Sequence, residues 1–362
     1  MRIGIVLNPY NEEKPSGLGR FIYEIASALI EGDAKNEYLV YVKGAPKKLP
    51  IFSGGNWRIC TGGKGLLWLD LLLFRNEPSD VYLFNTPSMP LFFRPRRSVV
   101  IALDFAYRHL PSDSIGERVK RFFLFRYHRF SLRKATHIVA TSETTKKDVI
   151  ELFHLPSNKI TVIYPGFISM KRFKEEPVPV PPHYFYYMGV IKERKNVFAM
   201  VKAFVRFKEL YPSDYQFLVA GNPSGEYYEK IQTFLAETPY SKDVVFLGYV
   251  TDGQAAYLYK HARAFIFTTL IEGATGMPVL EAMDAGTPVI TSNAPTSTEV
   301  NLGEAALLAD PENAESIAQA MEQIAKDDAL RSALVEKGRR FAAEFSWEKG
   351  ARSYRKVFSE QS

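Results

Sequence analysis

The chain has 362 residues, more than one ordinary hydrophobic core can organise, and its length predicts about two domains. Apolar residues make up 46% of the chain and charged residues 24%, which is typical of a soluble globular protein. The single cysteine, Cys60, excludes an internal disulfide and favours a reducing compartment, so we expect a cytoplasmic protein. The opening "MRIGIVLN" predicts a strand rather than a signal peptide, and the longest apolar run, Leu66 to Phe74, is too short to span a membrane.

The net charge of +6 is unevenly distributed. Residues 94–134 hold eleven Lys and Arg against three Asp and Glu, a net of +8, so the remainder of the chain sums to −2. A basic segment in an otherwise near-neutral chain indicates a polyanionic partner at one face, which could be anionic lipid, a phosphorylated acceptor or nucleic acid.

Within this segment, residues 115–134 predict a helix, because Ile115, Val119, Phe122 and Phe123 follow helical spacing. A helix lying on an anionic membrane surface would show this pattern. A core helix with arginines on its solvent face would show it too, and both interpretations remain open. The first would place the protein at the cytoplasmic face of the inner membrane as a peripheral protein.

The first half of the chain alternates short apolar runs with helical patterns. Runs of strand length are "RIGIVLN", "YLVYVK", "VYLFN", "SVVIAL", "THIVAT" and "KITVIY", and helical patterns include 20–30 and 142–153. The alternation predicts a parallel sheet covered by helices, and the near-continuous hydrophobicity of the runs predicts burial on both faces. We expect this first α/β domain to comprise residues 1–165.

A proline-rich segment follows the first domain. Four prolines fall within residues 177–182, which cannot form a helix, and we expect a stiff linker over 166–183. The alternation then restarts with "YFYYMG", "QFLVAG", "VVFLG", "AFIFTT" and "PVITS", which predicts a second doubly wound domain over 184–344. The last helical patterns, 314–326, 329–344 and 347–358, are amphipathic. Because ligands of open α/β sheets bind beyond the carboxyl ends of the strands, the loops that follow strands are the candidate sites.

The first such loop is "NPYNEEKPSGLGRF", which leads into a helix starting near Gly19. Gly17 and Gly19 would let the backbone approach a ligand closely, and the free amides of a helix start attract anions. A flexible turn explains this motif equally well when it is considered alone.

The second loop is "GVIKERKNV", in which Gly189 ends the first strand of the second domain. Arg194, Lys195 and Asn196 stand just before the following helix. A guanidinium, an ammonium and a helix N-terminus together suit a diphosphate. An Arg-Lys pair is more commonly a solvated basic turn, but its position after a strand favours binding.

The third loop is "EGATGMPVLEAMDAGTP", which places Glu272 just past a buried strand and Glu281 inside the next helix. Gly273 and Gly276 permit unusual backbone angles, and Pro278 suits the first turn of a helix. Each carboxylate can accept hydrogen bonds from two neighbouring hydroxyls. On spacing alone, however, a solvated loop for Glu272 and an exposed helix charge for Glu281 are the favoured interpretations.

Taken in order, these motifs resemble those of the retaining glycosyltransferases of family 4, whose architecture is the twin-Rossmann GT-B fold. The third loop resembles the family signature Glu-Gly-Phe-Gly-x-Pro-x-x-Glu-Ala. Further matches are "SGLGRFIYEIASAL", "VVIALDFAYRHLP", "ATHIVATSETTKKDVIELFHLPSNKITVIYPG", "MGVIKERKNVFAMVKAF", "VVFLGYVTDGQAAYLYKHARAFIFTT" and "FSWEKGARSY". The resemblance therefore covers nearly the whole chain.

The resemblance implies roles for the acidic residues of the third loop. Glu281 would hold the ribose hydroxyls of a sugar nucleotide. Glu272 would hold hydroxyls of the donor sugar, with the amides around Gly276 and Met277 close by.

The resemblance also implies which groups meet the phosphates. Arg194 and Lys195, after the strand that ends at Gly189, would neutralise the departing diphosphate, and Gly17 to Gly19 would approach the same phosphates from the first domain. A C-terminal helix over 345–362 would cross back to the first domain.

Two features depart from the family pattern. Nine positions separate Glu272 and Glu281 where the family has eight, because Ala274-Thr275 stands in place of a single Phe. The usual His-Asp pair is here Leu103-Asp104, so the role of the histidine is lost or taken elsewhere. His109 is a candidate replacement, although a loop histidine packed near Pro111 is the simpler interpretation.

The chemistry implied is transfer of a sugar from a GDP- or UDP-sugar with retention at the anomeric carbon. We expect front-face attack, with the diphosphate taking the acceptor's proton; Asp104 is the best candidate for a protein base. The chain contains no Asp-x-Asp and no evident cluster of oxygen ligands, so we expect no metal and no cofactor. The "GLGRF" and "RKN" motifs favour GDP-mannose, by resemblance only.

Two other function classes remain open from sequence. A sugar-nucleotide epimerase or hydrolase of the same fold would form its product without an acceptor. A nucleic-acid-binding protein is suggested by the pI near 9.1, but none of the usual modules is visible, so we expect no nucleic acid partner. The expected partners are a nucleotide diphospho-sugar donor and a glycan or lipid-linked saccharide acceptor, with the 115–134 segment as a candidate contact to anionic lipid.

Overall fold

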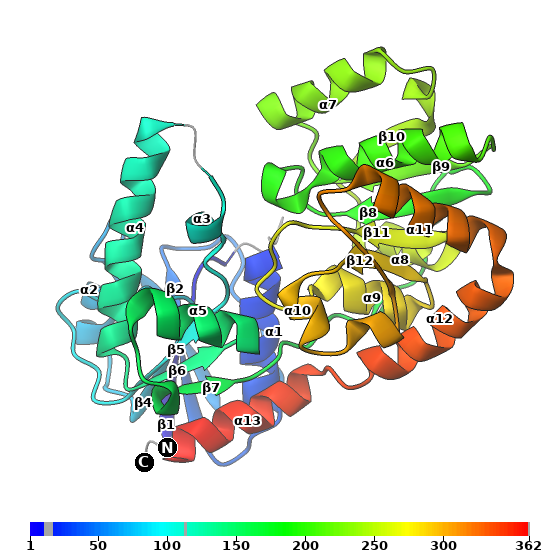
Figure 1. Cartoon of the computed structure of the whole chain (residues 1–362). Coiled ribbons are helices and arrows are strands. Elements are labelled where there is room, and N and C mark those ends of the chain that lie inside the picture. Colours follow the sequence, from blue (N-terminus) through cyan, green and yellow to red (C-terminus); the bar gives the residue numbers. More distant parts are fainter. Residues whose placement is uncertain (11–16, 112–113, 361–362) are drawn as a thin grey trace. The chain divides into compact units, whose positions relative to one another are not determined.

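The computed structural model describes residues 1–10, 17–111 and 114–360, and the chain divides into two compact units (Figure 1). Unit 1 comprises Met1–Gly166 together with Ser346–Ser362, and unit 2 comprises Phe167–Phe345. The chain therefore leaves unit 1 after Gly166 and returns to it at Ser346. The C-terminal helix belongs to unit 1, although it follows unit 2 in the sequence.

Unit 1 is built on a seven-stranded sheet with the strand order β3-β2-β1-β4-β5-β6-β7, in which every pairing is parallel. Its strands are β1 (Arg2–Leu7), β2 (Glu37–Lys43), β3 (Trp57–Gly62), β4 (Val81–Phe84), β5 (Ser98–Ala102), β6 (His137–Ala140) and β7 (Ile160–Val162). Its helices are α1 (Gly17–Glu31), α2 (Trp68–Arg75), α3 (Ala106–His109), α4 (Ile115–Lys134), α5 (Glu143–Phe153) and α13 (Trp347–Glu360), with a 3-10 turn η1 (Ser157–Lys159). The central strands β1, β4, β5 and β6 are almost wholly buried, as their continuous apolar runs predict.

The edge strand β3 was not predicted from the sequence. Of its residues "WRICTG", only Cys60 is fully buried, and the others are exposed or half-buried. An edge strand has one free side, so it needs no continuous apolar run. The strand is recognisable only through its parallel pairing with β2, where Tyr41 lies opposite Cys60.

The C-terminal helix α13 completes unit 1 by packing along α1, as Figure 1 shows in red against blue. The ring of Trp347 meets that of Phe21 edge-on, with centroids 5.5 Å apart, and Tyr354 and Phe358 are buried. The backbone of Gly166 passes directly beneath the first turn of α13. A Cβ on Gly166 would lie 2.4 Å from the backbone nitrogen of Trp347.

We therefore expect Gly166→Ala to destabilise unit 1. The clash is with backbone atoms, which cannot rotate away, so α13 must shift from α1, at an expected cost of about 1–3 kcal/mol. Gly116→Ala is the matched control: it lies in the first turn of α4, its added Cβ has only an ordinary 3.7 Å contact, and it should leave stability unchanged or raise it by less than about 1 kcal/mol. Urea denaturation of the two variants measures both effects. Equal stability of the two variants would contradict this close approach.

Unit 2 is built on a six-stranded parallel sheet with the order β10-β9-β8-β11-β12-β13. Its strands are β8 (Tyr184–Met188), β9 (Gln216–Ala220), β10 (Val244–Gly248), β11 (Ala264–Phe267), β12 (Val289–Ser292) and β13 (Leu307–Ala309). Its helices are α6 (Val197–Leu210), α7 (Glu226–Ala236), α8 (Asp252–His261), α9 (Met277–Ala285), α10 (Pro295–Thr298), α11 (Ala314–Lys326) and α12 (Asp328–Ala342). The 3-10 turns of this unit are η2 (Met170–Arg172), η3 (Glu193–Lys195), η4 (Ser241–Asp243) and η5 (Leu302–Glu304).

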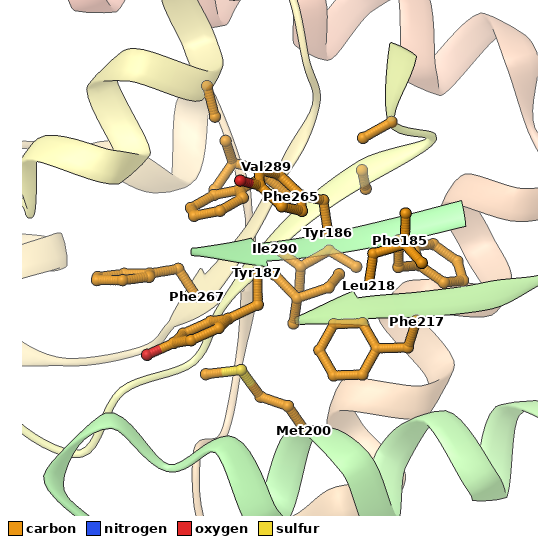
Figure 2. Close-up of a cluster of buried hydrophobic side chains, with 14 of the residues drawn as sticks. Phe185, Tyr186, Tyr187, Met200, Phe217, Leu218, Phe265, Phe267, Val289 and Ile290 are labelled. Carbon is orange, nitrogen blue, oxygen red and sulfur yellow. The ribbon is translucent and has the colours of Figure 1, made fainter. Parts of the chain in front are cut away.

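The core of unit 2 is unusually aromatic around β8 and β11. Figure 2 shows Phe185, Tyr186 and Tyr187 of β8 beside Phe265 and Phe267 of β11, with further apolar side chains from β9, β12 and α6. Successive residues of a strand point to opposite faces, so burial of the whole of "YFYY" confirms the prediction that this sheet is covered on both sides. The short edge strand β13 was not predicted.

The segment expected to be a linker, residues 166–183, is not a free connection. Phe167 onward belongs to unit 2, and the side chains of Ile168 and Met170 are buried in its core. Ser169 Oγ donates to Asp284 on α9 at 2.6 Å, and Lys171 pairs with the same carboxylate at 2.7 Å. The prolines excluded a helix correctly, but the apolar residues before them hold the segment against unit 2.

The helix predicted over 115–134 is present as α4 with the same bounds. Only Ser131 and Leu132 in its last turns are buried, whereas Ile115, Val119, Phe122 and Phe123 are exposed. The interpretation of α4 as a core helix is therefore wrong for these four residues. No helix within the described part of the chain is both long enough and apolar enough to cross a bilayer.

Candidate functional site

The loops that follow β8 and β11 in unit 2 are joined by one side-chain and one backbone hydrogen-bond donor, each to a backbone carbonyl of the other loop. Asn196, in the left-handed conformation at φ 58°, donates from Nδ2 to the carbonyls of Thr268 at 2.9 Å and Pro311 at 2.6 Å. The amide of Leu270 donates to the carbonyl of Arg194 at 3.1 Å. Because β8 and β11 are neighbours in a parallel sheet, their carboxyl ends lie at one edge, and these contacts hold the two loops in a fixed relation.

The two motifs carried by these loops meet in an ion pair. Lys195 Nζ contacts Glu272 Oε1, and the ammonium lies 5.0 Å from the centre of the Phe267 ring. The two side chains are only 11% and 17% exposed. A solvated basic turn for Lys195 and a solvated loop for Glu272 are therefore both wrong.

The guanidinium of Arg194 lies in the same loop and has an unusual feature. Its Nη1 atom is buried and has no hydrogen-bond partner among the described residues. An unpaired buried donor on a cation is costly unless an anion satisfies it. The same edge of the sheet carries Tyr187, whose pKa is raised well above its usual value, first by burial and next by the charge of Glu272.

The second glutamate of the signature is buried inside unit 2. Gly276, at φ 90°, turns the chain into α9, and Met277 and Pro278 form the first turn of that helix. Glu281 lies one turn further along, is 4% exposed and accepts a hydrogen bond from the hydroxyl of Tyr259 at 3.2 Å. The interpretation of Glu281 as an exposed helix charge is therefore wrong.

The extra residue between the two glutamates is accommodated in the loop. Thr275 is buried before the turn at Gly276, and a Cβ on Gly276 would lie 3.0 Å from the ring of Phe267. Despite the nine-residue spacing, Glu272 still reaches Lys195 and Glu281 still lies within α9. Both carboxylates therefore lie in unit 2 with partners at the loops after β8 and β11 or within its core.

Of the remaining predicted site residues, Gly17, Gly19 and Asp104 belong to unit 1 and Gly189 to unit 2. Gly17 begins α1 and Gly19 is buried in its first turn, while residues 11–16 of the predicted glycine loop lie outside the described residues. Asp104 follows β5 and accepts from the amide of Ala106 at 3.2 Å. In unit 2, Gly189 follows β8 and donates its amide to Ala220 at 2.9 Å.

Leu103 stands where the family pattern has a histidine, and His109 and His128 each have a partner of their own in unit 1. The side chain of Leu103 is only half-buried, and its carbonyl accepts from the hydroxyls of Thr141 at 2.8 Å and Thr145 at 3.1 Å. His109 is exposed and pairs with Asp148 of α5 at 2.9 Å. His128 of α4 was not predicted: its Nδ1 lies 3.1 Å from the hydroxyl of Tyr107.

The partly buried position of His128 makes unit 1 sensitive to acid. Burial lowers the pKa of His128 to about 4, against a partly opposing influence of Asp104. The unfolded chain therefore binds this proton near pH 6.5 while the folded chain does not, and stability present above pH 6.5 is lost as the pH falls toward 4. We expect a loss of roughly 3 kcal/mol at most from this group.

Comparing wild type with His128→Gln tests this effect. The glutamine can still accept from Tyr107, so the variant should lose less stability than wild type between pH 7 and pH 4.5 in urea denaturation. His137, whose pKa is also lowered by burial, contributes in the same direction to both proteins and cancels in the comparison. Parallel pH profiles for the two proteins would contradict a lowered pKa of His128 in the folded chain.

Two residues of the site could not be found from sequence motifs. Phe267 ends β11 and lies beneath Lys195, and Tyr259 of α8 hydrogen-bonds Glu281 from 22 positions away. Both look like ordinary core aromatics in the sequence, and only the alternation within "AFIFTT" signals which face Phe267 takes.

Across the described ranges, no group of three or more His, Cys, Asp or Glu side chains lies close enough together to hold a metal ion.

Comparison with known families gives two adjoining matches. Residues 15–168 match the family described as "Glycosyltransferase Family 4", and residues 169–341 match "Glycosyl transferases group 1". O-antigen chain mannosyltransferase B of Escherichia coli is 29% identical over 281 residues, which cover 74% of this chain and 71% of that protein. O-antigen chain mannosyltransferase RfbU of Salmonella typhimurium is 27% identical over 63% of this chain, and the match spans only 61% of RfbU.

Solved structures of the same architecture superpose over almost the whole chain. Sucrose-phosphate synthase from Thermosynechococcus elongatus has a TM-score of 0.79 at 17% identity, with 99% of both chains covered. HepE of Anabaena, solved in complex with UDP and glucose, has a TM-score of 0.76 at 16% identity, with 99% of this chain and 100% of HepE covered. At these low identities, the structural similarity establishes the fold alone. It confirms the expectation of two Rossmann-like units in the GT-B architecture.

Proposed function

The chain belongs to the group 1 glycosyl transferases, and from that membership we propose that it transfers mannose from GDP-mannose, with retention, to a hydroxyl of a saccharide acceptor in cell-surface polysaccharide synthesis. The choice of mannose is supported by the two O-antigen mannosyltransferases among its relatives. A nucleotide-sugar donor is further supported by HepE, which shares the fold and was solved with UDP.

The observation that carries the proposal is the Lys195–Glu272 pair together with the unpaired Nη1 of Arg194. A cation that a carboxylate already contacts, beside a buried guanidinium nitrogen that pairs with no described residue, suits a ligand that is anionic on one side and rich in hydroxyls on the other. A nucleotide diphospho-sugar has both properties. Glu281, buried one turn into α9, would accept from two neighbouring hydroxyls such as those of a ribose.

The proposed reaction needs charge stabilisation more than proton transfer. The bond between the anomeric carbon and the diphosphate oxygen breaks, and the acceptor oxygen forms a bond to the same face of that carbon. The acceptor's proton passes to the departing diphosphate. Arg194 and Lys195 stabilise the negative charge that develops on the diphosphate as the bond lengthens.

The test is a donor screen with and without an acceptor. We expect GDP to raise the thermal midpoint more than UDP, because binding to the folded chain alone stabilises it. GDP release from GDP-mannose should require a mannose-terminated acceptor oligosaccharide and should persist in EDTA, since we propose a metal-independent reaction. Rapid acceptor-independent turnover would favour an epimerase or hydrolase, and abolition by EDTA would exclude metal independence.

A further inference from the structure

The N-terminal half of α4 exposes large apolar side chains in a row. Ile115 is 79% exposed, Val119 51%, Phe122 58% and Phe123 66%. These residues stand at positions i, i+4, i+7 and i+8, so they share one side of the helix. The rings of Phe122 and Phe123 contact each other at 5.6 Å rather than the core of unit 1.

The same side of α4 becomes basic toward its C-terminus. Arg126 and Arg133 continue the stripe at positions i+11 and i+18 from Ile115, Arg118 borders it, and all three are exposed. Arg121, on another side, is instead bound to Glu117 and to the carbonyl of Leu110. One helix about 30 Å long thus carries an apolar end followed by a cationic stretch.

A second exposed apolar group lies on α2 and the loop after β4. Leu66, Leu71, Phe74 and Phe92 are exposed, Leu66 by 82%. The buried carboxylate of Asp70 fixes this group by accepting from the amides of Leu91, Phe92 and Phe93 at 2.6–3.0 Å. Three arginines, Arg94, Arg96 and Arg97, follow directly in the chain. Leu66 and Tyr127 of α4 line a common small pocket, so this group lies beside α4 in unit 1.

We propose that this face of unit 1, formed by α4 and the α2 group, binds the surface of an anionic lipid bilayer. The phenylalanines of α4 enter the interface between headgroups and acyl chains, and Arg118, Arg126 and Arg133 contact lipid phosphates. The partner is lipid rather than a second copy of the chain, because a two-fold contact would bring two strongly basic segments together. Lipid also fits better than nucleic acid. The phosphates and bases of a nucleic acid would offer no apolar surface for the exposed aliphatic side chains of Ile115 and Val119.

Vesicle flotation tests separately the insertion of the phenylalanines and the contact of the arginines with lipid phosphates. The full chain is mixed with vesicles of phosphatidylcholine, or of phosphatidylcholine with about one third phosphatidylglycerol, and the bound fraction is measured. Wild type should float with the anionic vesicles far more than with the neutral ones. Phe122→Ser with Phe123→Ser should lower the partition coefficient by about a hundredfold. Arg118→Gln, Arg126→Gln and Arg133→Gln together should lower it by a similar factor, at about fivefold per arginine.

Matched control variants remove exposed side chains of the same types from unit 2. Tyr249→Ser removes an aromatic side chain that is 61% exposed, and Lys242→Gln with Lys337→Gln and Arg340→Gln removes three exposed cations. These variants should float like wild type, and thermal midpoints should show that all variants are folded. Equal flotation of the α4 variants and wild type would overturn the proposal. So would concentration-dependent dimerisation of wild type, lost in the α4 variants, without vesicle binding.

Discussion

Lys195→Ala is expected to lower kcat by about 10²–10³ while leaving the fold intact. The ammonium lies in a nearly buried position between Glu272 and the ring of Phe267, at the edge of the sheet where Arg194 also projects. There, water is too scarce to replace a missing cation as the diphosphate leaves. Steady-state turnover at saturating GDP-mannose and acceptor measures the loss.

Three further variants separate charge from packing at this position. Lys192→Ala removes an exposed lysine from the same loop and should retain full activity. Lys195→Arg keeps a cation and should recover part of the rate. Lys195→Ala with Glu272→Gln removes the carboxylate charge left unpaired by the single change, so it should restore stability but not turnover. Turnover of Lys195→Ala within threefold of wild type would exclude the proposed role.

Glu281→Ala is expected to weaken binding of the nucleoside diphosphate by about a hundredfold, since hydrogen bonds to a charged acceptor contribute about 1.5–3 kcal/mol. Glu281 is only 4% exposed, so solvent cannot readily take the place of its carboxylate. Titration calorimetry with GDP measures the change, which should appear as a higher KM for the donor with a smaller change in kcat.

Two neighbours of Glu281 give the controls. Asp284→Asn alters another carboxylate of α9, one that is bound by Ser169 and Lys171, and should lower stability without changing GDP affinity. Tyr259→Phe removes the hydroxyl that donates to Glu281 and should weaken GDP binding only several-fold. If Glu281→Ala binds GDP as tightly as wild type, the ribose role is wrong.

The sequence was informative where a residue's environment follows from local pattern. The continuous apolar runs predicted the central strands, and the loops after β8 and β11 were recognised as candidate sites because Gly189 and Glu272 follow buried strands. The segments that escaped prediction were those without local signals. β3 is half-exposed and β13 has only three residues, so neither contains an apolar run long enough to predict a strand.

Contacts between distant segments were likewise beyond a single sequence. Nothing near Lys195 indicates that it lies 5.0 Å from the ring of Phe267, and nothing near Glu281 indicates Tyr259. The favoured interpretation of both glutamates as solvated charges failed for the same reason: burial is decided by what packs over a side chain, not by its own segment. The resemblance to a family supplied what spacing alone did not.

The path of the chain between the units has a consequence for synthesis. Unit 2 is continuous, from Phe167 to Phe345, whereas unit 1 needs α13 to cover α1. As the chain emerges from the ribosome, unit 2 can complete its fold first, while the apolar side of α1 stays uncovered until the residues of α13, which follow unit 2, have been made. A nascent chain that stalls before Trp347 would therefore present Ile25 and its neighbours to chaperones, even with unit 2 already folded.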